Sequence, residues 1–284
     1  MTYKVITNYQ DASFEYFLYF NDISSGALKK MPYYTRDGYK LYYNHSGDGY
    51  PVIFIHGYLG SSHTHWGPQL SDNQLSQFQL IAPDLRGYGK SSKGKRVEKH
   101  QTTDHIFDLR ELITNTLKLQ NKPIFVGYSI GGTLALMYAI RFPEDVQGIV
   151  LVSPRPFLGK ITRSWNFLAK EKRSGKNRSL GISFLWAIVK RVQKIKTYIS
   201  IKRQYKRSST YLQELEQINV PIIMIHGNQD TVNPAITYRV LKKHLPQAQI
   251  IELQCDHGIT HEHPEQFNEL LYDFLAQTAR ENEE

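Results

Sequence analysis

Short, continuously apolar runs recur along most of this 284-residue chain, and amphipathic stretches separate them. A continuous apolar run, as opposed to an alternating one, is typical of a parallel strand that is buried on both faces. The runs are Pro51–Ile55, Leu80–Ala82, Pro123–Val126, Gly148–Val152, Pro221–Ile225 and Ile250–Leu253. Strands that alternate with helices form a mainly parallel sheet with right-handed crossovers. We therefore predict an α/β fold.

The stretches between the runs predict helices, because their apolar residues recur at helical spacing. These stretches are Thr103–Leu119, Ile130–Arg141, Pro234–His244 and Pro264–Ala276. Ahead of the first run, two aromatic-rich segments flank Arg36-Asp37-Gly38, and Asp-Gly is a strong signal for a hairpin turn. We expect an antiparallel hairpin there, which adds two strands to the sheet.

The alternation of strands and helices breaks between Ser153 and about Asn219, where only basic helical patterns occur. We interpret residues 154–216 as a helical cap, or lid, inserted after the sixth strand. Residues 33–153 and 217–284 then form the α/β core. Residues 1–32 form an N-terminal extension, which we expect to pack on the body as an arm or to serve in dimerisation.

Positive charge is concentrated in the predicted cap. The whole chain has a formal net charge of +9, yet between Arg155 and Arg207 sixteen Lys and Arg face one acid, Glu171, so this segment carries +15. Apolar residues share one helical face there, and we interpret that helix as a lid over a binding site. Its basic side chains would also suit an anionic substrate or an anionic membrane surface. The stretch has no recognisable nucleic-acid-binding module, so we expect no nucleic-acid partner.

The location is expected to be cytoplasmic, with at most peripheral contact with a membrane. The N-terminal residues lack the basic start and apolar stretch of a signal peptide. The longest apolar runs fall well short of the 18 or so residues that span a bilayer. Cys255 is the single cysteine, which excludes an intrachain disulfide, and we interpret it as a buried residue at a strand end.

A G-x-S-x-G motif occupies residues 127–131, as Gly127-Tyr128-Ser129-Ile130-Gly131. It lies between a predicted buried strand and a predicted helix, which is the setting in which a sharp turn exposes a serine hydroxyl above the sheet. A serine hydroxyl is a weak nucleophile at neutral pH and needs a base that is oriented by a carboxylate. We predict that Ser129 is a catalytic nucleophile.

An acid and a histidine follow two later strands, as this chemistry requires. Asp230 comes just after the run Pro221–Ile225, and His257 comes just after the last run. The carboxyl ends of parallel strands meet at one edge of the sheet, so we predict a catalytic triad of Ser129, Asp230 and His257. Asp256 competes with Asp230, but side chains of adjacent residues rarely reach each other. We expect His226 at a strand end, and His261 and His263 on the surface.

The segment His56-Gly57-Tyr58-Leu59-Gly60 follows the first apolar run. Its glycines allow a backbone N–H to point into the site. We predict an oxyanion hole made by the backbone N–H groups of Tyr58 and Ile130. His56 is interpreted as a structural brace for this loop.

Taken in chain order, these motifs and the segment Asp84–Ser91 resemble the α/β-hydrolase fold superfamily, in the capped branch of serine hydrolases and esterases. The resemblance covers about residues 33–153 and 217–278. It implies an eight-stranded, mainly parallel sheet flanked by helices, with an inserted helical cap, and a structural role for Asp84–Ser91. Epoxide hydrolases and haloalkane dehalogenases share the pattern but carry aspartate where Ser129 stands, so their chemistry is disfavoured. Asp256 departs from the family, which usually has glycine there.

The leading hypothesis is hydrolysis of a small-molecule carboxylic ester with an apolar acyl chain, through an acyl-enzyme intermediate and without a metal or organic cofactor. One alternative keeps the triad but performs lyase chemistry of the menaquinone-pathway type or C–C bond hydrolysis. Thr133 stands where that lyase family tends to carry arginine. Another alternative is a non-enzymatic ligand sensor or signalling protein, and a third is a basic membrane-binding module with a vestigial site.

Overall fold

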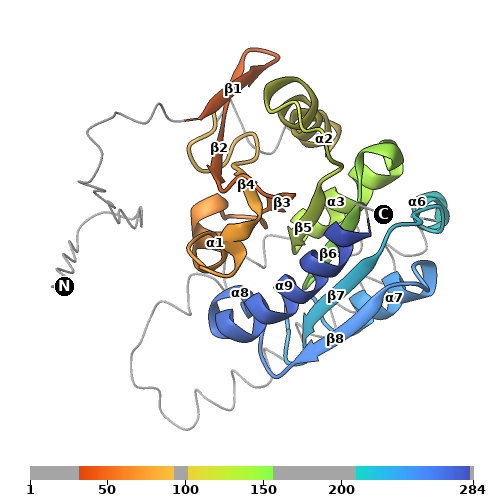
Figure 1. Ribbon diagram of the computed structural model, residues 1–284. Coiled ribbons are helices and arrows are strands. Elements are labelled where there is room, and N and C mark those ends of the chain that lie inside the picture. The colour runs from red at the N-terminus through yellow and green to blue at the C-terminus, as the bar shows by residue number, and fades with distance from the viewer. Residues whose placement is uncertain (1–31, 93–101, 156–208, 282–284) are drawn as a thin grey trace, which may run out of the picture. The chain divides into compact units, whose positions relative to one another are not determined.

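An eight-stranded sheet forms the centre of the computed structural model, which describes residues 32–92, 102–155 and 209–281 (Figure 1). The strand order is β1-β2-β4-β3-β5-β6-β7-β8. Strands β3 to β8 pair with one another in parallel. Strand β2 is antiparallel to both of its neighbours, β1 and β4. The strands are β1 (Tyr33–Arg36), β2 (Tyr39–Ser46), β3 (Pro51–Ile55), β4 (Gln79–Pro83), β5 (Ile124–Tyr128), β6 (Gly148–Val152), β7 (Ile222–Gly227) and β8 (Gln249–Leu253).

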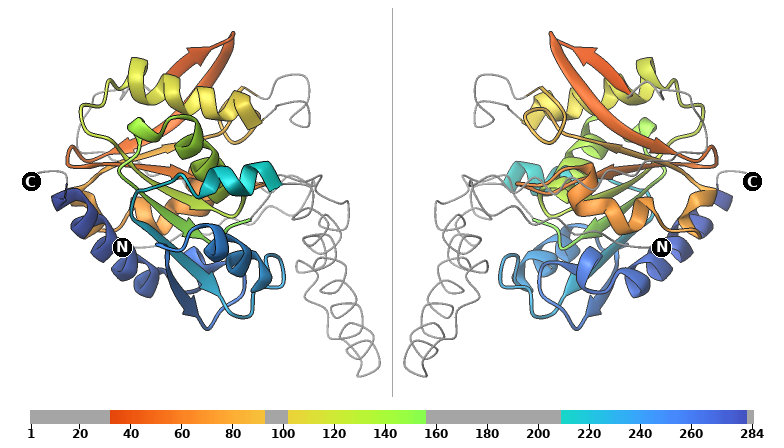
Figure 2. Two further views of the ribbon diagram at one scale, coloured as in Figure 1. Left: turned by 90° about the vertical axis from the view of Figure 1, so that its right-hand side faces the viewer. Right: turned by 90° about the vertical axis from the view of Figure 1, so that its left-hand side faces the viewer.

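Helices cover both faces of this sheet (Figure 2). Val52 and Phe54 belong to an apolar cluster with residues of α1, α8 and α9, while Ile53 and Ile55 belong to a second cluster with residues of α2, α3, α6 and α7. This division follows from the two-residue period of a strand, which sends successive side chains to opposite faces. The helices are α1 (Ser62–Leu70), α2 (Thr102–Arg110), α3 (Ile130–Arg141), α6 (Ser209–Leu215), α7 (Ile236–His244), α8 (Ile259–Glu262) and α9 (Pro264–Arg280). Short turns η1 (Leu75–Gln77) and η4 (Pro143–Asp145) are 3-10 helical.

The fold confirms the predicted α/β class, and each of the apolar runs overlaps a strand of the sheet. The expected hairpin is formed by β1 and β2. Its two turn residues, Asp37 and Gly38, have φ angles of 51° and 77°. Two successive residues with positive φ make the type of turn whose twist matches an antiparallel pair, which explains the Asp-Gly sequence.

The helix predicted over Thr103–Leu119 differs from expectation. The α-helical part ends at Arg110 and continues as a π-helix, η3 (Glu111–Thr116). The Leu117 N–H donates to the Leu112 carbonyl at 2.8 Å, which is the five-residue spacing of a π-turn. The Thr114 hydroxyl donates to the Arg110 carbonyl at 2.8 Å, so a side chain competes with the backbone for that acceptor.

Two predicted segments lie largely outside the described residues. The predicted extension, residues 1–32, is described only at Pro32, and the predicted cap, residues 154–216, is described only at its two ends. The C-terminal end of the predicted cap contains α6. Within the part of the chain that the structure covers, no helix is both long enough and apolar enough to cross a membrane.

Candidate active site

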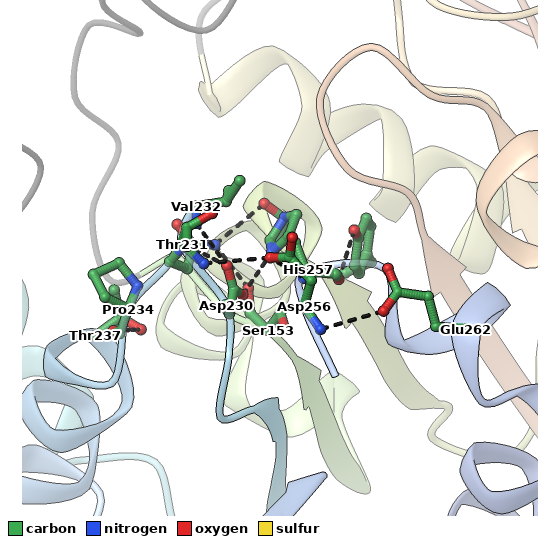
Figure 3. A network of polar contacts seen from close by, with 12 residues as sticks. Ser153, Asp230, Thr231, Val232, Pro234, Thr237, Asp256, His257 and Glu262 are labelled. Carbon is green, nitrogen blue, oxygen red and sulfur yellow. Dashed lines mark hydrogen bonds and ion pairs between the residues drawn. The ribbon is translucent and has the colours of Figure 1, made fainter. Parts of the chain in front are cut away.

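The three predicted triad residues follow three strands of the parallel part of the sheet. Ser129 follows β5, Asp230 lies in the loop after β7, and His257 lies in the loop after β8. Parallel strands end at the same edge, so the three loops meet at this edge of the sheet. Figure 3 shows Asp230 and His257 side by side there. In an α/β sheet, ligands usually bind at the carboxyl ends of the parallel strands.

The turn that carries Ser129 has a constrained backbone. Ser129 adopts φ 55° and ψ −112°, in the positive-φ region that side chains disfavour. Its N–H donates to the Val152 carbonyl at 2.8 Å, which ties the turn to β6. A Cβ on Gly127 would lie 2.5 Å from the Gly131 carbonyl oxygen, and a Cβ on Gly131 would overlap the Ile55 carbonyl. The two glycines of the motif are therefore required by close backbone approach.

Asp230 and His257 form a direct side-chain pair. Nδ1 of His257 lies 2.7 Å from Oδ2 of Asp230, and the Asp230 side chain is fully buried. The other oxygen, Oδ1, accepts the backbone N–H groups of Val232 and Asn233 at 2.8 Å each. Because Oδ1 is occupied by these donors, Oδ2 is left to face the imidazole. A proton on Nδ1 that is shared with the carboxylate leaves Nε2 as the basic nitrogen.

Ser129 lies in the same site without a direct bond to this pair. Among the described residues, Oγ of Ser129 hydrogen-bonds to Nδ2 of Asn233 at 3.4 Å, and no hydrogen bond joins it to His257. In a protein without bound substrate, a nucleophile and its base often lie farther apart than in the reacting complex. The geometry therefore joins Asp230 directly to His257, and it links the serine hydroxyl to the loop of Asp230 through Asn233.

Tyr128 supports His257, a role that the sequence analysis missed. Its hydroxyl donates to the His257 carbonyl at 2.9 Å, and the two rings pack with centroids 5.0 Å apart. Burial raises the pKa of Tyr128 well above its usual value, so the hydroxyl keeps its proton and remains a donor. No local pattern could reveal this contact, because 129 positions of sequence separate the two residues.

The loop after β3 is held by two histidines. Nε2 of His56 accepts the Leu85 N–H at 3.0 Å, and its Nδ1 lies 2.8 Å from the Gly57 carbonyl. His56 therefore links the loop after β3 to the loop after β4, which agrees with a structural role. His65, on α1, accepts the Gly57 N–H through Nδ1 at 3.0 Å. Desolvation lowers the pKa of His65 to about 3, so its ring is neutral and able to accept. The sequence analysis did not identify His65.

The predicted oxyanion donors stay predictions, although the local geometry is compatible with them. Leu59 has φ 61°, and the Gly60 N–H donates to the Gly57 carbonyl at 3.3 Å, so Gly57–Gly60 forms a tight turn. Within the described residues, neither the Tyr58 N–H nor the Ile130 N–H donates a hydrogen bond. Ile130 is the first residue of α3, where a helix leaves its N–H groups unpaired.

The competing residues lie in structural positions. Oδ1 of Asp256 accepts the backbone N–H groups of His257 and Thr231, at 2.8 and 3.3 Å, and so organises the two loops. Burial raises the pKa of the Cys255 thiol to about 11, which keeps it protonated. His226 is fully buried at the end of β7. His261 and His263 are exposed.

The segment Asp84–Ser91 also forms a structural loop. Asp84 accepts the N–H groups of Ser62 and Lys90 at 2.7 Å each, and Arg86 forms a bidentate ion pair with buried Asp108. Within the described ranges, no group of three or more His, Cys, Asp and Glu side chains is placed to hold a metal ion.

Comparisons with known proteins agree with this architecture. Residues 50–171 match the family model described as the alpha/beta hydrolase fold. A pimeloyl-[acyl-carrier protein] methyl ester esterase of Nitrosomonas europaea is 24% identical over 78% of this chain and 94% of its own. A Bacillus subtilis protein provisionally named 2-succinyl-6-hydroxy-2,4-cyclohexadiene-1-carboxylate synthase is 28% identical over 79% of this chain and 90% of its own. Among solved structures, a protein of Burkholderia cenocepacia described as a candidate aryl esterase is 25% identical, with a TM-score of 0.67, over 88% of this chain and 100% of its own.

Proposed function

This chain has the α/β-hydrolase fold and is related to proteins of that superfamily, and on this premise we propose that it is a serine hydrolase of small-molecule carboxylic esters. The observation that carries the proposal is the 2.7 Å pair of His257 and Asp230 beside a serine on a strained strand-to-helix turn. A base that is oriented by a buried carboxylate is what a serine hydroxyl needs to react at neutral pH.

In the proposed reaction, Oγ of Ser129 attacks the acyl carbon while Nε2 of His257 takes its proton. The buried carboxylate of Asp230 stabilises the charged imidazole that results. Backbone N–H groups of Tyr58 and Ile130 donate to the oxygen that becomes negative. His257 then gives its proton to the leaving alcohol. A water molecule that is activated by His257 releases the acid from Ser129 in the second half of the reaction.

The substrate class is proposed from similarity to the Nitrosomonas europaea esterase and from the predicted apolar face of the cap. The basic segment between Arg155 and Arg207 lies almost entirely outside the described residues. Recruitment of an anionic substrate or of an anionic membrane surface by that segment therefore stays a prediction from its charge.

The test is hydrolysis of p-nitrophenyl esters from C2 to C16 by wild type and by Ser129→Ala, with fluorophosphonate labelling of both. We expect wild type to turn over and to label, and we expect Ser129→Ala to lose activity on the order of 10⁶-fold and to lose labelling. The preferred chain length then measures the acyl pocket. A wild-type protein that neither labels nor turns over any ester would overturn the proposal and favour a ligand sensor.

A pyruvate-eliminating lyase of the menaquinone-pathway type, which the sequence also resembles, is the second candidate function. The Bacillus subtilis relative is 28% identical and carries the provisional name of a carboxylate synthase, not of an esterase. The residue at position 133 argues against the lyase. Where that lyase family tends to carry arginine, Thr133 is fully buried and donates to the Arg155 carbonyl. Fluorophosphonate labelling without ester turnover, together with release of pyruvate from the lyase substrate, would favour this candidate.

A further inference from the structure

A buried amide lies beside the serine hydroxyl. Asn233 comes three residues after Asp230, and its residue surface is only 3% exposed. Its Nδ2 lies 2.8 Å from the Ser153 carbonyl oxygen and 3.4 Å from Oγ of Ser129. The side chain therefore connects the loop after β6 with the nucleophile.

The orientation of this amide is fixed by its partners. A carbonyl oxygen can only accept, so the Ser153 carbonyl requires Nδ2, and not Oδ1, on this side of Asn233. The backbone N–H of Asn233 donates to Oδ1 of Asp230, which holds the residue from its other end. The second amide proton is thus directed toward Ser129. Oγ of Ser129 then acts as an acceptor, and its own proton stays available for Nε2 of His257.

We propose that Asn233 is a further catalytic residue, whose amide N–H stabilises negative charge on Oγ of Ser129 as the acyl bond forms and breaks. The inference rests on the proposed serine hydrolase function. During attack, Oγ gives its proton to His257 while the bond from Oγ to the acyl carbon forms. During release, that bond breaks, and Oγ takes the proton back from His257.

In both steps Oγ carries partial negative charge, and a donor aimed at it is more favourable then than in the resting state. Hydrogen bonds to charged groups contribute more than those between neutral groups, and they are shorter. The 3.4 Å contact is expected to tighten as the charge develops. Asn233 thus meets the requirement for differential stabilisation of the transition state.

The experiment compares Asn233→Ala and Asn233→Asp with wild type. Asn233→Asp keeps the size of the side chain but replaces the donor with an oxygen. Both variants are expected to lose about 10- to 100-fold in the second-order rate of fluorophosphonate labelling and in kcat, with little change in KM. The matched control is Asn268→Ala. Asn268 is also buried and also donates through Nδ2, to Asp72 at 2.7 Å, but it lies on α9.

The outcomes separate this inference from the proposed function. If wild type itself fails to label, the proposed function fails and the role of Asn233 fails with it. If wild type labels and the folded Asn233 variants label at the same rate, the role of Asn233 is overturned while the serine hydrolase stands. Thermal unfolding of each variant gives the folded fraction, and a labelling loss that this fraction fully accounts for also overturns the catalytic role.

Discussion

At the scale of single residues, Tyr128 connects the turn that carries Ser129 with the loop that carries His257. Replacing it by phenylalanine removes the 2.9 Å bond from its hydroxyl to the His257 carbonyl and keeps the ring that packs on the imidazole. We expect Tyr128→Phe to lower kcat/KM roughly five- to tenfold, because one hydrogen bond is worth about 1 kcal/mol. Ester kinetics at saturating and limiting substrate measure this loss.

Tyr238→Phe is the control for that substitution. It removes a hydroxyl that donates to Glu252 at 2.6 Å, and it leaves the contacts of His257 in place. Equal kcat/KM for Tyr128→Phe and wild type would show that the tyrosine hydroxyl does not position the base.

The placement of Ser129, Asp230 and His257 at one edge of the sheet could be predicted from sequence because each follows a recognisable strand. Ser129 sits in a motif with a fixed local shape, and Asp230 and His257 follow apolar runs. The residues that support them could not be predicted. The contacts of Tyr128 and Asn233 join loops that lie far apart in the chain, and only the folded sheet brings them together.

At the scale of elements, the structural role of the glycines in the strand-to-helix turn can be tested by protein stability, without an activity measurement. A Cβ on Gly131 would overlap the Ile55 carbonyl and approach the His56 carbonyl at 2.8 Å. Both obstacles are backbone atoms, which cannot rotate away. We expect Gly131→Ala to destabilise the protein by about 1–3 kcal/mol, measured by urea denaturation.

Gly67→Ala is the comparison variant. Gly67 lies inside α1, and apart from its chain neighbours and its own helix a Cβ there would meet nothing within 4 Å. The gain of up to about 1 kcal/mol for alanine over glycine in a helix is offset because a Cβ before Pro68 disfavours the helical conformation, so we expect a smaller loss of stability than in Gly131→Ala. Similar losses in both variants would show that the close approach at Gly131 does not limit the turn.

The elements that sequence reasoning missed have identifiable causes. Helix α1 begins with a capping box of Ser61 and Thr64, which is a weaker signal than the usual glutamate, and it contains Pro68. The π-turn after Arg110 has no signature in apolar spacing, because its buried residues, Leu112 and Ile113, also fit the apolar pattern of an α-helix.

At the scale of the whole molecule, a neutral histidine couples stability to pH. His65 has a pKa of about 3 in the folded protein, compared with about 6.5 in an unfolded chain. The folded value is the lower one, so the unfolded chain takes up the proton first as the pH falls. The contribution of His65 is therefore fully present above about pH 6.5 and is lost progressively between about pH 6.5 and 3.

This dependence can be isolated with His65→Asn, whose side-chain oxygen can accept the Gly57 N–H in place of Nδ1. We expect the free energy of unfolding of wild type to fall more steeply below pH 6.5 than that of His65→Asn, by at most about 1.4 kcal/mol per pH unit. His63→Asn, at an exposed position of the same helix, should keep the wild-type slope. Parallel stability curves for wild type and His65→Asn would contradict the prediction.

The order of the strands has a consequence for biosynthesis. A ribosome delivers the serine turn long before the loop that bears the base, since β5 ends at residue 128 and β8 begins at residue 249. Asp230 cannot pair with His257 until β8 has added to the edge of β7. Helix α9 follows β8 and is the last helix described. On the proposed function, nascent chains that are arrested before β8 should therefore contain an unactivated serine, because His257 follows that strand.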